Sequence, residues 1–157
     1  MMMKEKTLSV SAIKEGTVID HITPGQALKI IRVLRLNANE NRVTVGLNLK
    51  RGAGGLKDII KIENVFLTES QAAQIAIFSP SATVNVIENY EVSKKFKVQM
   101  PETAKNVLAC PNTRCITNVE KVVTYFSVEE NNGQAILRCK YCEKIFTRDQ
   151  VHEKGSL

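Results

Sequence analysis

The chain has 157 residues, which suits one ordinary domain or two small ones. Hydrophobic residues make up 43% and charged residues 24%, which is typical of a globular protein and excludes a disordered one. No apolar run approaches the roughly 18 residues that a membrane span needs. Residues 1–16 lack the apolar core of a secretory signal, so we expect a cytoplasmic protein.

The positive charge is unevenly distributed along the chain. The formal net charge of +6 raises nucleic acid as a candidate partner. Residues 1–100 hold fourteen Lys and Arg against nine Asp and Glu, whereas residues 101–157 hold eight against seven. The net charge is therefore +5 in the first region and only +1 in the second.

The first region opens with alternating strand and helix signals. Two β-rich runs, at 7–13 and 17–22, are separated by Gly16. Pro24 and Gly25 mark the next boundary. A helix that ends near Leu36 is then predicted from an apolar stripe at helical spacing, formed by Ala27, Ile30, Ile31 and Leu34.

Two strands and a second helix follow. Residues 43–49 alternate apolar and polar side chains, which predicts a half-buried strand, and residues 56–64 form the expected return strand of a hairpin. Thr68 and Gln71 have the spacing of a capping box, which predicts the start of a helix that ends at Pro80.

Residues 82–92 are rich in valine and predict one final strand. From residue 17 onward the order is then β-α-β-β-α-β, which indicates an α+β fold with a ferredoxin-like antiparallel sheet and two helices. The run at 7–13 would add a strand. The charged segment 94–102 contains a proline and is the predicted linker, so we expect domains at 1–97 and 101–157.

All four cysteines lie in the second region, in the pattern C-x4-C, a spacer of 23 residues, then C-x2-C. In a reducing compartment this pattern favours a metal over disulfides. A redox CxxC motif would need a βαβ context that is absent here, and four unrelated thiols are the remaining alternative. Four thiolates leave Zn²⁺ no open position, so we expect one structural zinc ion, bound by Cys110, Cys115, Cys139 and Cys142.

The spacer between the cysteine pairs predicts a small β-rich domain. Two β-rich runs, 119–130 and 134–142, flank the turn Asn131-Asn132-Gly133, which is favoured in hairpins. Such a hairpin brings the second pair of cysteines beside the first. A segment this short holds few large apolar side chains, so metal binding supplies the missing folding free energy.

Polar residues near the strand ends of the first region form a candidate anion or nucleotide site. A polar residue of this kind, taken alone, more often has a side chain that faces solvent than one that binds a ligand. Ideal strand alternation puts Asp20 and His21 on opposite faces, so both join one site only if the strand end is irregular. No Ser-His-Asp or Cys-His pairing indicates catalysis. The candidates are Asp20, His21, Lys61, Asn85, Tyr90, Lys94 and Lys95.

Six blocks of the sequence resemble the regulatory chain of aspartate carbamoyltransferase, and they are 16–22, 43–49, 57–64, 82–92, 107–116 and 137–146. The resemblance implies a non-catalytic subunit with a nucleotide-binding allosteric domain and a zinc domain that contacts the catalytic chains. It also implies a homodimer formed through the allosteric domain. CTP as inhibitor and ATP as activator would compete for one site and so control pyrimidine biosynthesis.

The resemblance also implies roles for individual residues. Ala12, Ile13 and Tyr90 would contact the base, Asp20 and Lys61 the ribose, and His21 and Lys95 the phosphates. Val10, Val18, Asn85, Ile87 and Val92 would line the pocket. Ser11 stands where the family has an acidic residue, which leaves the base preference open. Lys94 beside Lys95 leaves the phosphate lysine ambiguous by one position.

A zinc-ribbon nucleic-acid-binding protein is the alternative, because the pI is near 9.2 and the four cysteines predict a zinc site. Such a module should concentrate Lys and Arg around the metal, whereas the cysteine segment is nearly neutral. Aromatic residues, which stack on bases, make up only 5% of the chain. We therefore expect no nucleic-acid partner.

Overall fold

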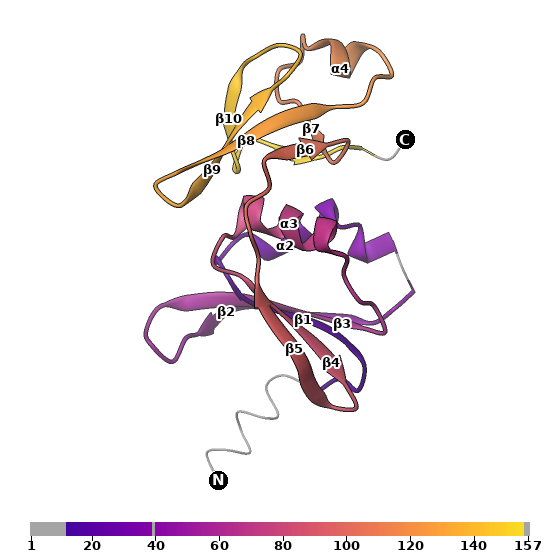
Figure 1. The fold of residues 1–157 in the computed structure, drawn as a ribbon, viewed down its shortest axis with the longest axis vertical. Helices are drawn as coiled ribbons and strands as arrows, with labels where there is room; N and C mark the ends of the chain where they lie inside the picture. Colours follow the sequence, from indigo (N-terminus) through magenta and orange to yellow (C-terminus); the bar gives the residue numbers. More distant parts are fainter. Residues whose placement is uncertain (1–11, 39, 156–157) are drawn as a thin grey trace.

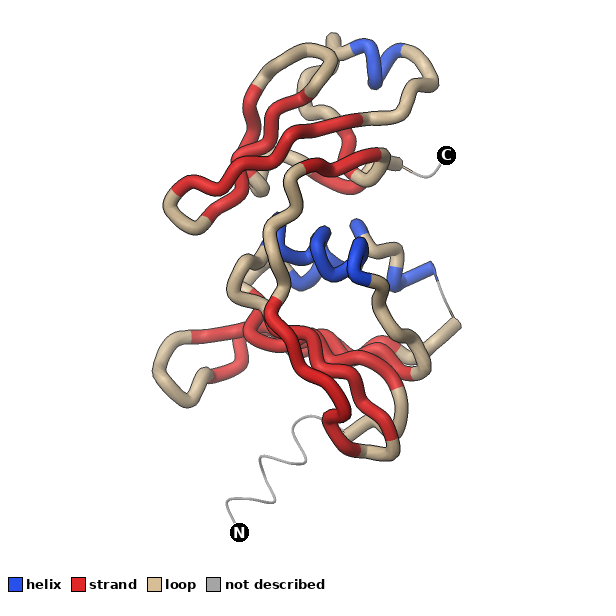
Figure 2. Tube along the Cα trace, in the orientation of Figure 1, coloured by secondary structure: helices blue, strands red, loops and turns tan. Residues whose placement is uncertain are grey.

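The computed structural model describes residues 12–38 and 40–155. A five-stranded sheet carries two helices on one face, and a smaller β-rich unit lies beyond those helices (Figure 1). The same layering is visible in Figure 2, where the helices separate the two sets of strands. Most of the expected strand at 7–13 lies outside the described residues, and Ala12 and Ile13 are not in a strand.

The first unit has the predicted order of elements. Its sheet runs β2-β3-β1-β4-β5 with every neighbouring pair antiparallel, which confirms the α+β fold class and the ferredoxin-like arrangement, with one extra edge strand. The elements are β1 (Gly16–Ile22), α2 (Ala27–Val33), a 3₁₀ turn η1 (Leu36–Ala38), β2 (Val43–Lys50), β3 (Leu56–Glu63), α3 (Glu69–Phe78), β4 (Thr83–Glu88) and β5 (Glu91–Lys97).

Strand alternation builds the core between this sheet and its helices. Ile19 of β1 pairs with Ile60 of β3, and both side chains are fully buried. They belong to the same apolar cluster as Ile30 of α2 and Ile75 of α3. Fully burying one such side chain stabilises the fold by about 1.5–3 kcal/mol. This apolar layer therefore holds the helices against one face of the sheet. The other face is left for polar residues.

Helix α3 has the predicted bounds, whereas α2 ends earlier than predicted. The capping box of α3 is present as predicted, with Gln71 N donating to Thr68 Oγ1 at 3.2 Å and Thr68 N donating to Gln71 Oε1 at 2.9 Å. The helix ends at Phe78, before Pro80. Helix α2 ends at Val33, three residues before the predicted end at Leu36.

The prediction of one strand over 82–92 is wrong. Asn89 and Tyr90 adopt positive φ angles of 53° and 68°, and the chain reverses there from β4 into β5. Two left-handed residues in succession make the tight turn that suits a two-residue hairpin. Consequently residues 94–97 belong to β5, and the linker to the second unit is confined to 98–102.

The second unit is built on the predicted hairpin. Strands β8 and β9 pair up to Asn131 and Gln134, and Asn132 and Gly133 between them have positive φ, as the turn requires. Strand β8 starts at Tyr125, later than the run at 119–130 suggested. The elements are β6 (Thr103–Lys105), β7 (Leu108–Ala109), α4 (Ile116–Val119), β8 (Tyr125–Asn131), β9 (Gln134–Cys139), β10 (Ile145–Thr147) and β11 (His152–Glu153).

These strands form two small sheets. A four-stranded sheet has the order β10-β9-β8-β6, and β7 pairs with β11. None of the helices in the described part of the chain combines the length and the apolar character that a membrane span requires.

A buried carboxylate fixes the start of α2. Asp58 of β3 is fully buried, and its Oδ2 accepts hydrogen bonds from Gly25 N at 3.0 Å and Ala27 N at 3.4 Å. Its Oδ1 accepts from Asn48 N at 2.9 Å, next to the register shift of β2. Helix N-termini leave backbone N–H groups unpaired, and an acceptor there satisfies them. Asp58 therefore ties β2, β3 and α2 together.

Replacing Asp58 with asparagine should lower the free energy of unfolding by about 2–4 kcal/mol, because the new amide NH₂ faces N–H donors and leaves some of them unpaired. Chemical unfolding followed by circular dichroism measures the change. Glu88→Gln removes an exposed carboxylate from β4 and should alter stability by less than about 0.5 kcal/mol. Equal stability of the two variants would contradict the role assigned to Asp58.

Candidate metal centre and polar sheet face

The four cysteine sulfur atoms converge to within 4.8 Å of one another. Cys110 follows β7 and Cys115 precedes α4, while Cys139 ends β9 and Cys142 lies in the turn before β10. Cys110 Sγ is 3.7 Å from Cys142 Sγ, and Cys115 Sγ is 3.7 Å from Cys139 Sγ. A tetrahedral centre with metal–sulfur bonds of about 2.3 Å requires sulfur–sulfur distances of about 3.8 Å. The spacing fits such a centre.

The protein environment shifts the pKa values of these thiols in different directions. Burial raises the pKa of the Cys110 thiol and that of the Cys139 thiol. Burial also acts to raise the pKa of the Cys142 thiol. The hydrogen bond from the Lys144 backbone and the hydrogen bond with the Asn112 side chain outweigh burial and help to lower that pKa to about 7. Because a metal binds the thiolate form, metal binding at this cluster must displace protons.

Two residues that the cysteine spacing did not predict support the cluster. Thr117 Oγ1 donates to Cys115 Sγ at 3.2 Å. Asn118 Nδ2 donates to Cys110 O at 2.8 Å and to Asn112 O at 2.7 Å, and so closes the loop between the first two cysteines. Such contacts orient metal ligands. With four sulfur donors and no open position, the arrangement suits a structural role.

The end of β1 is irregular where Asp20 and His21 lie. The pairing of β1 with β3 shifts between Ile19 and Ile22, and His21 has a φ of 57°. Its N–H donates to Asp20 Oδ1 at 2.7 Å. Ile19 and Ile22 are both buried in the core although they are three residues apart, so a bulge changes the alternation between them. This is the irregularity that a shared site for Asp20 and His21 requires.

Strand register defines a polar face on the side of the sheet away from the helices. Val18 pairs with Lys61 on one side and with Asn85 on the other, and Asn85 pairs with Lys95. Directly paired residues share a face, as do residues two apart on one strand. We call this face, defined by Val18, Asp20, Lys61, Asn85, Ile87, Val92 and Lys95, the outer face.

The remaining predicted residues are Tyr90, Ala12, Ile13 and Val10, and the first three of them lie outside the strands of the outer face. Tyr90 is 64% exposed in the β4–β5 turn, and its N–H donates to Lys14 O at 3.0 Å. Ala12 and Ile13 directly precede Lys14 in the chain. Val10 lies outside the described residues.

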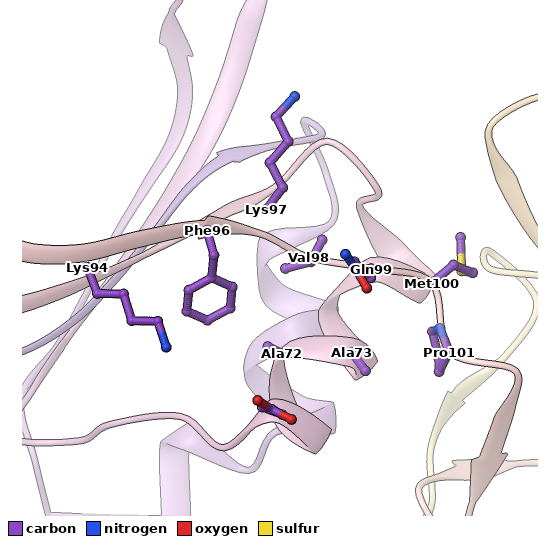
Figure 3. A pocket seen from close by; sticks show the side chains of 10 residues that line it. Ala72, Ala73, Lys94, Phe96, Lys97, Val98, Gln99, Met100 and Pro101 are labelled. Carbon is purple, nitrogen blue, oxygen red and sulfur yellow. The ribbon is translucent and has the colours of Figure 1, made fainter.

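Lys94 and Lys95 are on opposite faces of β5. Lys94 pairs with Val86, and its Nζ lies 5.5 Å from the centroid of the Phe96 ring. Both side chains line a pocket of about 530 Å³ between β5, α3 and the linker. Figure 3 shows Lys94 and Phe96 pointing to one side of the strand and Lys97 to the other. Lys95 alone of the adjacent pair shares a face with Asn85 and Lys61.

Lys57 is a further residue of the outer face, and the sequence analysis did not single it out. Its Nζ lies 2.9 Å from Asp20 Oδ1 and 3.2 Å from Oδ2. Burial acts to raise the pKa of Asp20, but the Lys57 ammonium and the His21 N–H outweigh it and hold that pKa below its usual value. Burial lowers the pKa of Lys61. The site therefore combines an ionised acid with lysines, an arrangement suited to hydroxyl and phosphate groups.

Two hydroxyl groups hold His21 in place. Ser81 Oγ donates to His21 O at 3.0 Å, and Thr83 Oγ1 lies 3.1 Å from His21 Nδ1. With Nδ1 engaged by the threonine, Nε2 is the ring nitrogen left to meet a ligand.

Comparison with known proteins gives matches over both units. Residues 8–99 match the family model of the aspartate carbamoyltransferase regulatory chain, allosteric domain, and residues 102–152 match that of its metal binding domain. A regulatory chain of this enzyme from Vibrio cholerae serotype O1 is 51% identical over 152 residues, covering 97% of this chain and 98% of its own length.

Further relatives have the same name and similar coverage. One from Aeromonas hydrophila is 50% identical over 153 residues, which cover 98% of this chain and 99% of that one. Another from Vibrio campbellii is 50% identical and is covered over its whole length. The two family models describe allosteric and metal-binding parts, and neither is catalytic. The chain belongs to the family of aspartate carbamoyltransferase regulatory chains.

Proposed function

We propose that this chain senses nucleotides for aspartate carbamoyltransferase, with CTP lowering and ATP raising the activity of associated catalytic chains, and thereby controls pyrimidine biosynthesis in the cytoplasm. The outer face is the observation that supports this most. It gathers Asp20, Lys61 and Lys95 on one side of a sheet whose other side is covered by helices. The effector domain would comprise residues 1–97 and the zinc domain residues 101–157.

The chemistry of the outer face suits a nucleoside triphosphate. Ionised Asp20 accepts from ribose hydroxyls, with Lys61 beside it. Lys61 and Lys95 lie three strand spacings apart, about 14 Å, so the ribose and the phosphates can lie along one row of strands. His21 and Lys95 would bind the phosphates through charge-assisted hydrogen bonds. The remaining contacts would come from Val10, Ala12, Ile13, Val18, Asn85, Ile87, Tyr90 and Val92.

The metal of the second unit is Zn²⁺ in this proposal, because four clustered thiols match its preferred donor set. Cys110, Cys115, Cys139 and Cys142 would bind one ion and hold the surface that docks on the catalytic chains. Exposed apolar side chains support a protein partner there: Ile116, Val119, Val123 and Tyr141 are each at least 42% exposed. The near-neutral charge of this segment argues against nucleic acid.

A homodimer through the first unit is supported by the edge strand β2. This strand pairs only with β3 among the described strands, so its outer backbone groups are available to a second chain. Leu47 on β2 is 48% exposed, and Leu28 and Leu56 are 47% and 44% exposed. The opposite edge, β5, presents charged residues and is a poorer interface.

Lys95→Ala should weaken CTP and ATP binding to the chain about tenfold or more, since one charge-assisted contact contributes about 1.5–3 kcal/mol. Lys94→Ala removes the same charge from the other face and is the matched control, with an expected change below about threefold. Isothermal titration calorimetry at low and high salt measures both affinities. Equal losses in the two variants would mean that only net charge matters and that Lys95 makes no specific contact.

The regulatory role is tested by reconstitution. The purified chain mixed with aspartate carbamoyltransferase catalytic chains should form a complex whose carbamoyl transfer is inhibited by CTP and activated by ATP. Catalytic chains alone should not respond. A complex that forms but ignores every nucleotide would contradict effector sensing, and the absence of any complex would contradict the docking role.

Removing zinc with a chelator, or replacing Cys139 with alanine, should unfold the second unit and abolish docking, because a small metal domain gains much of its folding free energy from the metal. Hydrogen exchange should show lost protection in β8 and β9 while α3 and β4 remain protected. Nucleotide affinity of the first unit should change by less than about threefold. Assembly of metal-free chain with catalytic chains would refute this role for the metal.

A further inference from the structure

A lysine of the first unit binds the backbone of the second. Lys29 lies on α2, and its Nζ donates to Arg148 O at 2.7 Å and to Val151 O at 2.9 Å. These carbonyl groups belong to the turn between β10 and β11, far along the chain from α2. Partial burial of the Lys29 ammonium lowers its pKa. The two hydrogen bonds fix the position of the turn against α2.

An arginine of the second unit makes the reciprocal contact. Arg148 Nη1 donates to Phe78 O at 2.9 Å. Phe78 is the last residue of α3, where helix carbonyl groups lack partners within the helix and the helix dipole is negative. A guanidinium group at that position makes a charge-assisted hydrogen bond. We call the three hydrogen bonds of Lys29 and Arg148 the interdomain latch.

The segment that follows α3 connects this latch to the outer-face site. Ser79 Oγ accepts from Thr23 N at 2.9 Å, just after β1. Ser81 Oγ donates to His21 O, and Thr83 Oγ1 contacts the His21 ring. The residues 78–83 therefore contact Arg148 at one end and the bulge of β1 at the other. A ligand that moves His21 must break these hydroxyl contacts or move the segment with it.

We propose that the interdomain latch carries the nucleotide response from His21, through residues 78–83, to the zinc-binding unit. The inference rests on the proposed nucleotide site and names the contacts by which that site acts on the rest of the molecule. Lys29 and Arg148 are positioning residues here and touch no ligand. Effector coupling in proteins amounts to about 1–3 kcal/mol, and substitutions along a coupled network change it by about 0.5–2 kcal/mol.

The test uses the complex reconstituted from full-length regulatory chain and catalytic chains. Lys29→Met keeps an unbranched apolar side chain and removes the ammonium, and Arg148→Met does the same for the guanidinium. Each should reduce the factor by which CTP or ATP changes the carbamoyl-transfer rate by about threefold or more. Affinity of the free chain for either nucleotide, measured by calorimetry, should stay within about twofold.

Two matched variants separate coupling from loss of charge or of stability. Arg32→Met removes an exposed cation from the last turn of the same helix and should leave the nucleotide effect unchanged. Arg148→Lys retains one charged donor for Phe78 O and should restore part of the effect. The double variant Lys29→Met/Arg148→Met should lose little more than either single variant, because the contacts act as one latch.

Each result has a distinct meaning. Normal nucleotide binding with an unchanged rate response in both methionine variants would overturn the latch and leave nucleotide sensing intact. Loss of assembly with catalytic chains in both variants, with no rescue by Arg148→Lys, would make the contacts merely structural and would also overturn it. An unmutated chain that binds no nucleotide would instead refute the proposed function.

Discussion

The bulge at the end of β1 is the feature on which the arrangement of the first unit depends. An unbroken strand would place Asp20 and His21 on opposite faces of the sheet. The extra residue keeps Ile19 and Ile22 in the core and lets Asp20 meet Lys57 while His21 meets Thr83. A left-handed histidine is strained, and the Asp20 carboxylate and the Ser81 hydroxyl on either side of its backbone stabilise it.

The second unit depends on a different constraint. Its larger sheet has four strands, and the cysteine-bearing loops follow β7 and β9. Among the described residues of this unit, the four-residue α4 is the only helix. Converging sulfur atoms therefore bring together loops that apolar packing alone holds weakly. The exposed apolar residues Ile116, which begins α4 directly after Cys115, and Tyr141, which lies between Cys139 and Cys142, are next to these cysteines in the chain. A metal at the cluster would thus fix the shape of that surface without contacting a partner itself.

Much of this structure follows from short-range patterns in the sequence. The strand at 43–49, the capping box at Thr68 and the Asn-Gly turn at Asn132 each follow from local patterns, and each was predicted correctly. The alternation in that strand fails at Leu47, which is 48% exposed because the register shifts between Gly46 and Leu49. The turn at Asn89 and Tyr90 was missed because a tyrosine rarely adopts positive φ, so 82–92 looked like one continuous strand. That error also made residues 94–97, the second half of β5, look like part of a linker.

Contacts between distant residues were the hardest to predict. Which of Lys94 and Lys95 joins the outer face depends on a register shift between β4 and β5, and a change of one residue reverses every side chain. The Lys57–Asp20 ion pair joins residues 37 positions apart on neighbouring strands. Thr117 and Asn118 support the cysteine cluster through hydrogen bonds to a sulfur atom and to a backbone carbonyl group. The spacing of the cysteines does not predict these contacts.

The layering of the molecule explains why a few hydrogen bonds can matter for regulation. The outer face and the cysteine cluster lie on opposite sides of the helix layer, so a ligand on one cannot touch the surface around the other (Figure 1). Any influence must cross α2, α3, the segment after α3 or the linker 98–102 that continues from β5. Hydrogen bonds to charged groups contribute about 1.5–3 kcal/mol each, which equals the usual size of an effector coupling. The apolar core keeps the two units folded, while the polar contacts of Lys29 and Arg148 have the right magnitude to favour one relative position over another.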